Sequence, residues 1–352
     1  MDQLMSWFDA GKCASDGTAV ERFWSGHGRC LASAATSQHV YRQLRRDQDM
    51  LQLVGPNLQA QARLPGINLP SLSPDFGTIS VPRYWGGTVH WPEGGNIFLS
   101  PAAASVEEAL KLTPRRPQDP DMDAARAVGL FRRACADLGT DQLWCRTPDV
   151  QGPLNAAGMI VRQEELLMAM HTEPSQVHAL LERVCTFLIE MLSFLRRETR
   201  DRICGNIWPY AFLPIARGLC FTEDLMPLLS TESYRRFAVP YLRRLDQAFG
   251  GLLIHCCGDW GRHARTLVEA DLNILAVEFH YPFTRLEELA CLADRAVFIP
   301  YIMLNKQKEF ASVAEYYRQL LDRARPGCRF WFACCDDSPE MQTFVTEASS
   351  AS

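Results

Sequence analysis

The stretch GGLLIHCCGDWGRHARTLVEADLNILAVEF, residues 250–279, decides the fold that we expect. It begins with a short run of small and aliphatic residues, which predicts a buried strand, and a Gly-Asp-Trp-Gly turn ends that strand. A helical segment over 261–270 and a second aliphatic run over 272–279 follow. A strand, a helix and a strand in this order predict two parallel strands joined by a crossover helix, which is typical of α/β proteins.

The same alternation continues in both directions along the chain. Further helices are expected over 123–139, 162–170, 173–198, 232–249, 284–293 and 312–324, and further strands over 141–145, 202–208, 295–303 and 328–335. This many units in a chain of 352 residues predict a closed (β/α)8 TIM barrel. An open, doubly wound α/β sheet is the alternative.

We expect the barrel to occupy residues 65–352 and an N-terminal helical extension to occupy residues 1–64. The segment 37–54 carries apolar residues at helix spacing. Residues 64–101 are rich in Pro, Gly and aromatic residues, which predicts loops and short strands whose aromatic side chains pack down. The segment 105–108 then has the capping-box spacing that begins a helix.

The composition points to a small-molecule or protein partner. Apolar residues make up 47% of the chain, and 36 basic and 41 acidic residues are spread without long runs, so neither a nucleic-acid surface nor a membrane surface is expected. We find no export signal and no apolar run long enough to span a bilayer. The thirteen cysteines therefore indicate thiols or metal ligands rather than a disulfide framework, and we expect a cytoplasmic protein.

Catalytic groups of a TIM barrel lie where its strands end and the following loops begin. These positions hold Asp149, Gln151, Trp208, Tyr210, His255, Cys257, Glu278, Tyr301, Cys334 and Cys335. Asp149, Glu278 and Tyr301 are the candidate catalytic residues. Trp208 and Tyr210 are candidates for binding a flat cofactor, with ordinary packing as the alternative.

Two of these positions indicate a metal site. Residues two apart in a strand point the same way, so His255 and Cys257 share one side while the cysteine between them points to the other. A thiolate from a later strand, Cys334 or Cys335, would complete a Cys2His set. Imidazole with two thiolates suits Zn2+, and three protein ligands leave an open position for chemistry. Glu278 is a candidate fourth ligand, and the alternative is a set of core thiols beside a hydrogen-bonded histidine.

The segments 147–184, 229–245 and 250–261 resemble the uroporphyrinogen decarboxylase-like superfamily, and the resemblance extends from about residue 64 to the C-terminus. Within that superfamily, the His-x-Cys pair with a distant third cysteine is similar to the zinc signature of the methylcobalamin:thiol methyltransferases. The spacing from Cys257 fits that branch at Cys334, whereas Cys335 is one residue off. The resemblance therefore favours Cys334 as the third ligand.

The resemblance implies a TIM barrel in which Zn2+ is the cofactor and lowers the pKa of a small thiol substrate. It also implies a methylated corrinoid as the methyl donor, carried by a corrinoid protein that docks over the barrel mouth. We therefore expect a zinc-dependent thiol methyltransferase. The chain lacks the arginine-rich substrate motif of the decarboxylase itself, so decarboxylation of a porphyrinogen is disfavoured. A carboxy-lyase that acts on a small carboxylated substrate with the same fold is the alternative. A non-catalytic corrinoid-binding or metal-sensing module is a third interpretation.

Overall fold

The computed structural model describes residues 3–34, 47–74, 76–92, 97–206, 211–334 and 336–350. Within them, the largest sheet has six parallel strands in the order β1–β11–β10–β9–β8–β7. Their bounds, in chain order, are β1 Cys30–Ala34, β7 Leu219–Thr222, β8 Leu252–Cys256, β9 Ile274–Tyr281, β10 Val297–Ile302 and β11 Arg329–Cys334. A second parallel sheet contains β2 (Ser71–Leu72), β5 (Trp144–Arg146) and β6 (Ile203–Cys204).

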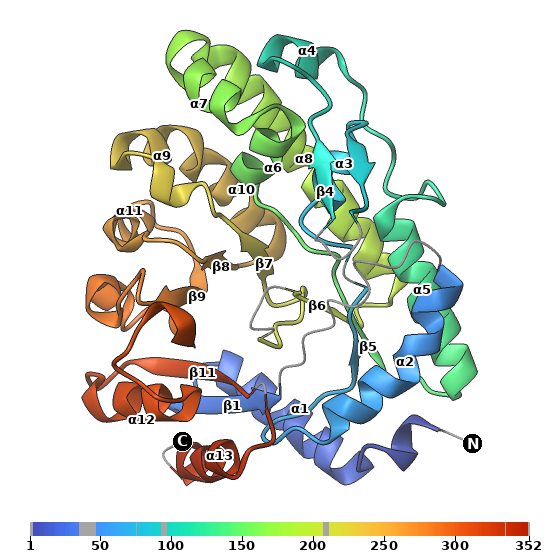
Figure 1. The fold of residues 1–352 in the computed structure, drawn as a ribbon, viewed down its shortest axis with the longest axis vertical. Helices are drawn as coiled ribbons and strands as arrows, with labels where there is room; N and C mark the ends of the chain where they lie inside the picture. Colours follow the sequence, from blue (N-terminus) through green and yellow to red (C-terminus); the bar gives the residue numbers. More distant parts are fainter. Residues whose placement is uncertain are drawn as a thin grey trace.

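Isolated bridges connect these two sheets at two places. Ser33 of β1 pairs with Ile67, which precedes β2, and Gln151, which follows β5, pairs with Thr222 of β7. The strands therefore lie around a common centre with the helices outside them (Figure 1). This arrangement is TIM-barrel-like, as the alternation of strands and helices predicts.

Most of the helices follow the predicted segments. The segment expected as a helix over 284–293 forms a 3-10 helix, Leu286–Leu292, and the expected helix over 232–249 is divided at Ala238, because Pro240 has no backbone N–H for a continuous helix. The predicted helix start at Ser105 is confirmed, since the Ser105 hydroxyl accepts a hydrogen bond from the backbone N–H of Glu108 (3.2 Å) where α4 begins. The Glu108 carboxylate accepts a hydrogen bond from the backbone N–H of Ala104 (2.9 Å), one residue before the position that a capping box requires. From α3 onward the helices are α3 Ser80–Arg83, α4 Val106–Lys111, α5 Asp123–Leu138, α6 Pro153–Ile160, α7 Gln163–Thr172, α8 Pro174–Glu198, α9 Thr231–Phe237, α10 Val239–Phe249, α11 Ala264–Glu269, α12 Val313–Arg323 and α13 Pro339–Ser350. Across the described part of the chain, no helix is both long and apolar enough to cross a membrane.

The N-terminal segment contains a strand that the sequence interpretation missed. Helices α1 (Ala10–Trp24) and α2 (Asp47–Ala62) agree with the expected helical extension. However, β1 lies between them and pairs with β11 along its whole length, from Cys30 opposite Phe330 to Ala34 opposite Cys334. The extension over 1–64 is therefore not purely helical, because β1 is an edge strand of the main sheet.

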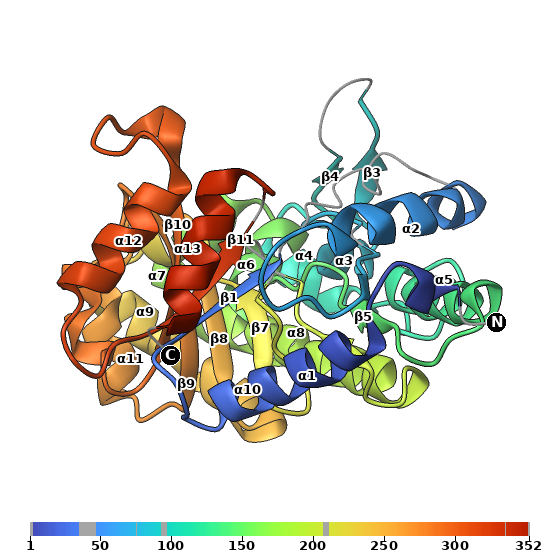
Figure 2. The ribbon, with the colours of Figure 1, turned by 90° about the horizontal axis from the view of Figure 1, so that it is seen from below.

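Helix α1 covers the end of the sheet at which the strands begin. The ring of Phe23 packs edge-on against Trp331 of β11, with 5.7 Å between the ring centroids. The carbonyl oxygen of Phe23 also accepts a hydrogen bond from Arg329, the first residue of β11. Figure 2 shows α1 on the opposite side of the molecule from the hairpin of β3 (Thr88–His90) and β4 (Phe98–Ser100).

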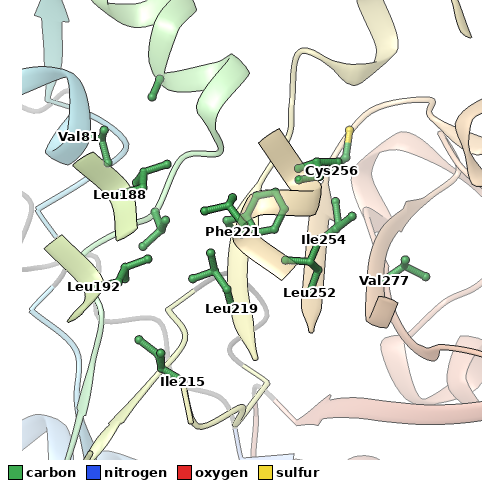
Figure 3. Packing of buried hydrophobic residues seen from close by; sticks show 14 of the residues in the cluster. Val81, Leu188, Leu192, Ile215, Leu219, Phe221, Leu252, Ile254, Cys256 and Val277 are labelled. Atoms are coloured by element: carbon green, nitrogen blue, oxygen red, sulfur yellow. The ribbon is translucent and has the colours of Figure 1, made fainter. Parts of the chain in front are cut away.

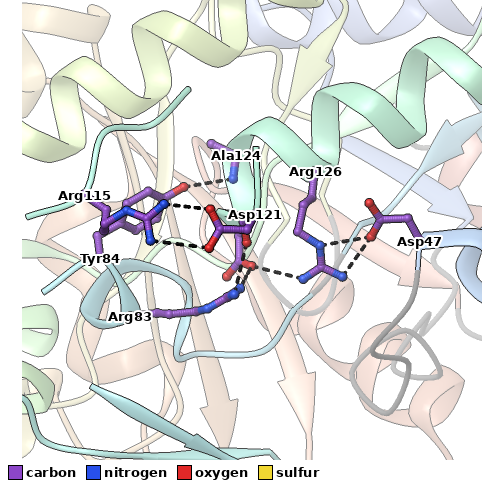
Figure 4. Close-up of polar contacts among 8 residues, drawn as sticks. Asp47, Arg83, Tyr84, Arg115, Asp121, Ala124 and Arg126 are labelled. Atoms are coloured by element: carbon purple, nitrogen blue, oxygen red, sulfur yellow. Dashed lines mark hydrogen bonds and ion pairs between the residues drawn. The ribbon is translucent and has the colours of Figure 1, made fainter. Parts of the chain in front are cut away.

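The aromatic segment before α4 packs down onto the helices, as predicted. Tyr84 is fully buried against Phe187 of α8, with 4.7 Å between the ring centroids. Its hydroxyl accepts a hydrogen bond from the backbone N–H of Ala124 (2.9 Å), and Arg83 forms an ion pair with Asp123 (Figure 4). These contacts attach the segment to the beginning of α5.

Alternate residues of β8 face two hydrophobic clusters. Leu252, Ile254 and Cys256 belong to the outer cluster, which lies between the sheet and the surrounding helices (Figure 3). Leu253, whose side chain points to the other face of the strand, belongs to the inner cluster, which includes Trp331 of β11. The predicted alternation is therefore confirmed for Cys256, which points away from the interior.

Candidate metal centre

The candidate site begins with a row of residues across the strand ends. Strand pairing aligns Thr222 of β7 with His255 of β8 and aligns His255 with Glu278 of β9. The bridge between Gln151 and Thr222 adds a fourth position to the row. Because aligned residues of neighbouring strands share a face of the sheet, these side chains lie on the same side.

His255, Cys257 and Asp224 come together where β7 and β8 end. One ring nitrogen, the thiol sulfur and one carboxylate oxygen all lie within 4.8 Å of one another. Nε2 of His255 is 4.0 Å from Oδ1 of Asp224, and the same oxygen accepts a hydrogen bond from the backbone N–H of Cys257 (3.0 Å). His255 is buried, whereas Asp224 and Cys257 are exposed, so a solute can reach this group of donors.

Glu278 lies behind His255 and is only 1% exposed. One carboxylate oxygen contacts Nδ1 of His255, and the other is 2.8 Å from Nε2 of His280, two residues further along β9. These three residues form a second group whose ligand atoms lie within 4.8 Å of one another. Tyr301 of β10 is aligned with His280, and their ring centroids are 4.8 Å apart.

The buried groups shift one another's pKa values. Burial alone would raise the pKa of Glu278, but His255 and His280 beside it hold that pKa below its usual value. Burial alone would lower the pKa of His255, but Glu278 above all, together with Cys257 and Asp224, raises that pKa well above its usual value. The raised pKa favours the protonated form of the His255 imidazole, and a divalent cation at Nε2 would have to displace the proton there.

The donors fit a zinc ion at Asp224, His255 and Cys257. Imidazole nitrogen, thiolate sulfur and carboxylate oxygen are the protein ligands of Zn2+. A histidine that binds a metal usually donates its second ring N–H to a carboxylate, which fixes the orientation of the ring. Glu278 occupies that position on Nδ1 of His255. The structure thus places the Glu278 carboxylate behind the imidazole, whereas the sequence suggested it as a fourth ligand.

The structure does not bring Cys334 to this group. Cys334 is fully buried at the end of β11 and belongs to the outer cluster, together with Phe330 and Phe332 of the same strand. Neither group of ligand atoms that contains His255 includes it. The sequence spacing could not reveal the side of the strand on which this thiol lies. The alternative third ligand, Cys335, lies outside the described residues, as do Trp208 and Tyr210.

Asp149 lies at the start of a chain of hydrogen bonds that leads to Asp224. The carboxylate of Asp149 accepts a hydrogen bond from Nε2 of Gln151 (2.6 Å), and Oε1 of Gln151 accepts one from Nδ2 of Asn155 (3.0 Å). Oδ1 of Asn155 then accepts a hydrogen bond from the backbone N–H of Leu225 (2.9 Å). These contacts hold the backbone next to Asp224 in place.

A pocket of about 240 Å³ lies beside this chain of hydrogen bonds. Its polar lining consists of Thr78, Gln151, Asn155, Gln163 and Asp224. Since Asp224 contributes both to the pocket and to the donor group, a molecule in the pocket would lie directly beside the candidate metal centre.

Sequence reasoning missed Asp224, and it considered His280 but interpreted it as a residue that hydrogen-bonds locally. Asp224 follows β7, and the short apolar run of β7, residues 219–222, was the signal that would have added another strand end. His280 lies two residues beyond Glu278, and β9 continues through Tyr281. Strand alternation therefore places His280 on the same side as Glu278, although the following proline suggested that the strand ended earlier.

Comparison of the sequence with models of known protein families found no match, and comparison with curated proteins found none either. Among solved structures, the chain is similar to a methyltransferase from Methanosarcina mazei, with a TM-score of 0.63, 10% identity, and coverage of 96% of this chain and 98% of that one. It also matches a Listeria monocytogenes protein assigned as a vitamin-B12-independent methionine synthase, with a TM-score of 0.44, 10% identity, and coverage of 91% and 96%. The first likeness shows a shared fold, and the second is too weak to carry an argument.

Proposed function

We propose that the protein is a zinc-dependent methyltransferase that activates a thiol substrate for methyl transfer. The observation that carries this proposal is the convergence of the His255, Cys257 and Asp224 donors at the ends of parallel strands. The shared fold with a methyltransferase from Methanosarcina mazei supports the reaction class. We also propose that the linked sheets form a complete (β/α)8 barrel, with the site at the carboxyl ends of its strands.

Bound zinc would supply a Lewis acid that brings the pKa of a thiol into the neutral range. The chain's own residues orient the site. Glu278 holds Nδ1 of His255, which leaves Nε2 facing Asp224 and Cys257. The backbone N–H of Cys257 binds the Asp224 carboxylate, and the hydrogen bonds from Asp149 through Asn155 fix the backbone after Asp224.

We propose Asp224 as the third protein ligand, because its carboxylate is within reach of both His255 and Cys257. A third ligand from Cys334 or Cys335 is the alternative. Cys334→Ser and Cys335→Ser variants separate these cases, because only the loss of a true ligand lowers the zinc content. The proposed methyl donor is a methylated corrinoid on a partner protein, and the proposed location is the cytoplasm, where Cys257 stays reduced.

Zinc analysis of the reduced, purified protein tests the proposal. We expect close to one zinc per chain, lost in Cys257→Ser and retained in Cys291→Ser, which removes another exposed thiol. Incubation with methylcobalamin and a panel of thiols should then demethylate the corrin, as followed by its visible spectrum. Absence of zinc would contradict the proposal and favour the carboxy-lyase, and zinc without methyl transfer would favour the metal-sensing module.

A further inference from the structure

The pocket beside Asp224 has a lining that bears on the substrate's chemistry. Its polar groups are the amides of Gln151, Asn155 and Gln163, the hydroxyl of Thr78 and the Asp224 carboxylate. None of the described residues that line it is a lysine or an arginine. A sulfonate, phosphate or carboxylate is normally bound by such cationic side chains, and here it would find only neutral dipoles and a carboxylate.

The charges around the pocket are also unfavourable for an anion. The Asp149 carboxylate binds Gln151 directly behind the lining, and Glu278 lies behind His255. With zinc bound, the charges of Cys257 and Asp224 would offset those of the metal, so the centre would add no net positive charge beside the pocket. The Asp224 carboxylate in the lining then favours a cation and repels an anion.

The amides can also serve as acceptors for a cationic group. Gln163 is half-buried at the first position of α7 and lines the pocket. Its carbonyl oxygen accepts hydrogen bonds, as does the second lone pair on Oε1 of Gln151. Carbonyl oxygens together with a nearby carboxylate are suitable partners for an ammonium group, which has three donors and no acceptor.

We propose, on the basis of the function proposed above, that the substrate is a small aminothiol. Its sulfur lies at the metal centre and its ammonium group lies in the pocket lined by Gln151, Gln163 and Asp224. Thiols with a sulfonate or carboxylate tail are excluded by the same lining.

Binding of three S-methyl ethers that differ only in the tail tests this proposal. The set is 2-(methylthio)ethylamine, 2-(methylthio)ethanol and 2-(methylthio)ethanesulfonate, titrated by calorimetry into the purified protein before and after chelator treatment. We expect the amine to bind best and the sulfonate at least about tenfold more weakly. Equal or tighter binding of the sulfonate, or no binding of any of the three ethers, would overturn the aminothiol assignment.

The ethers have no thiol that needs a metal, so the ranking can be read in zinc-free protein. If the protein as purified contains no zinc but still prefers the amine, the proposed zinc-dependent methyltransferase is overturned and the cation-selective pocket is retained. If the protein as purified contains zinc but prefers the sulfonate, the aminothiol assignment is overturned and the zinc centre is retained.

Introducing a charge at Gln163 gives a second measurement. Gln163→Arg should weaken binding of the amine and strengthen binding of the sulfonate by roughly three- to tenfold each, and Gln163→Glu should have the opposite effect. Gln52→Arg adds the same charge at an exposed position on α2 and should change neither affinity. If Gln163→Arg and Gln52→Arg behave alike, the tail does not bind in this pocket.

Discussion

Replacing Glu278 with glutamine would remove the charge behind His255 and preserve the size of the side chain. Glu278 is 1% exposed and contacts both His255 and His280, so water cannot take over its role. The amide oxygen of the variant can still accept the Nδ1–H of His255, but the amide nitrogen then faces His280. Loss of such a supporting carboxylate typically weakens metal binding about 10- to 100-fold, or about 1.4–2.7 kcal/mol.

Competition with a chromophoric zinc chelator near neutral pH measures this change. Glu269→Gln is the matched control, because Glu269 forms a half-exposed surface ion pair with Arg235, and its zinc affinity should stay within about twofold of the unmodified protein. If Glu278→Gln also stays within that range, the carboxylate does not orient His255. A loss of zinc affinity beyond about a thousandfold would indicate that Glu278 binds the metal directly, and would therefore also contradict the orienting role.

Three further predictions concern the folded state and are measured by urea unfolding. Gly152→Ala should lower the free energy of unfolding by about 1–3 kcal/mol, because its new Cβ would overlap the buried Glu223 carboxyl. Gly129→Ala in α5, whose Cβ meets nothing within 4 Å, should raise the free energy of unfolding by up to about 1 kcal/mol. Equal effects of the two substitutions would contradict this reasoning. Tyr84→Phe should lower the free energy of unfolding by about 1–3 kcal/mol, because the buried backbone N–H of Ala124 in α5 loses its acceptor. Unchanged stability would contradict the role of the Tyr84 hydroxyl as that acceptor. Burial lowers the pKa of His263 to about 4, so the unfolded chain takes up a proton before the folded protein does, and the free energy of unfolding falls as the pH drops from about 7. The loss should reach about 2 kcal/mol at about pH 5 and should be missing in His263→Gln. If the unmodified protein and His263→Gln show parallel profiles of stability against pH, His263 is not the cause.

The sequence was most informative where a strand is long and its pattern is regular. The alternation of strands and helices predicted the parallel sheet, and strand periodicity separated His255 from Cys256. These features are local, because side-chain direction along a strand depends only on neighbouring residues. Strands β1 and β7 escaped notice because CLASA consists mainly of small residues and LCFT is buried on both faces, so neither shows an alternation of apolar and polar residues.

Which residues come together in the site depends on contacts between strands, and the spacing of residues in the sequence does not reveal those contacts. Asp224 follows the missed strand β7, so it could not be considered as a ligand. Cys334 matched the expected spacing, yet it lies on the face of β11 that packs against the outer cluster. Which residues meet at the centre is fixed by strand register and by the side each strand presents, and both are properties of the assembled sheet.

X-ray absorption at the zinc edge of the zinc-loaded protein tests the central claim most directly. We predict a first shell with sulfur at about 2.3 Å and nitrogen or oxygen at about 2.0–2.2 Å, and an additional sulfur after a thiol substrate is added. Cys257→Ser protein, which should not retain zinc on purification, should show no protein sulfur in the first shell when excess zinc is added back. A first shell that contains no sulfur, or one that does not change when the thiol is added, would contradict a zinc centre that activates thiols.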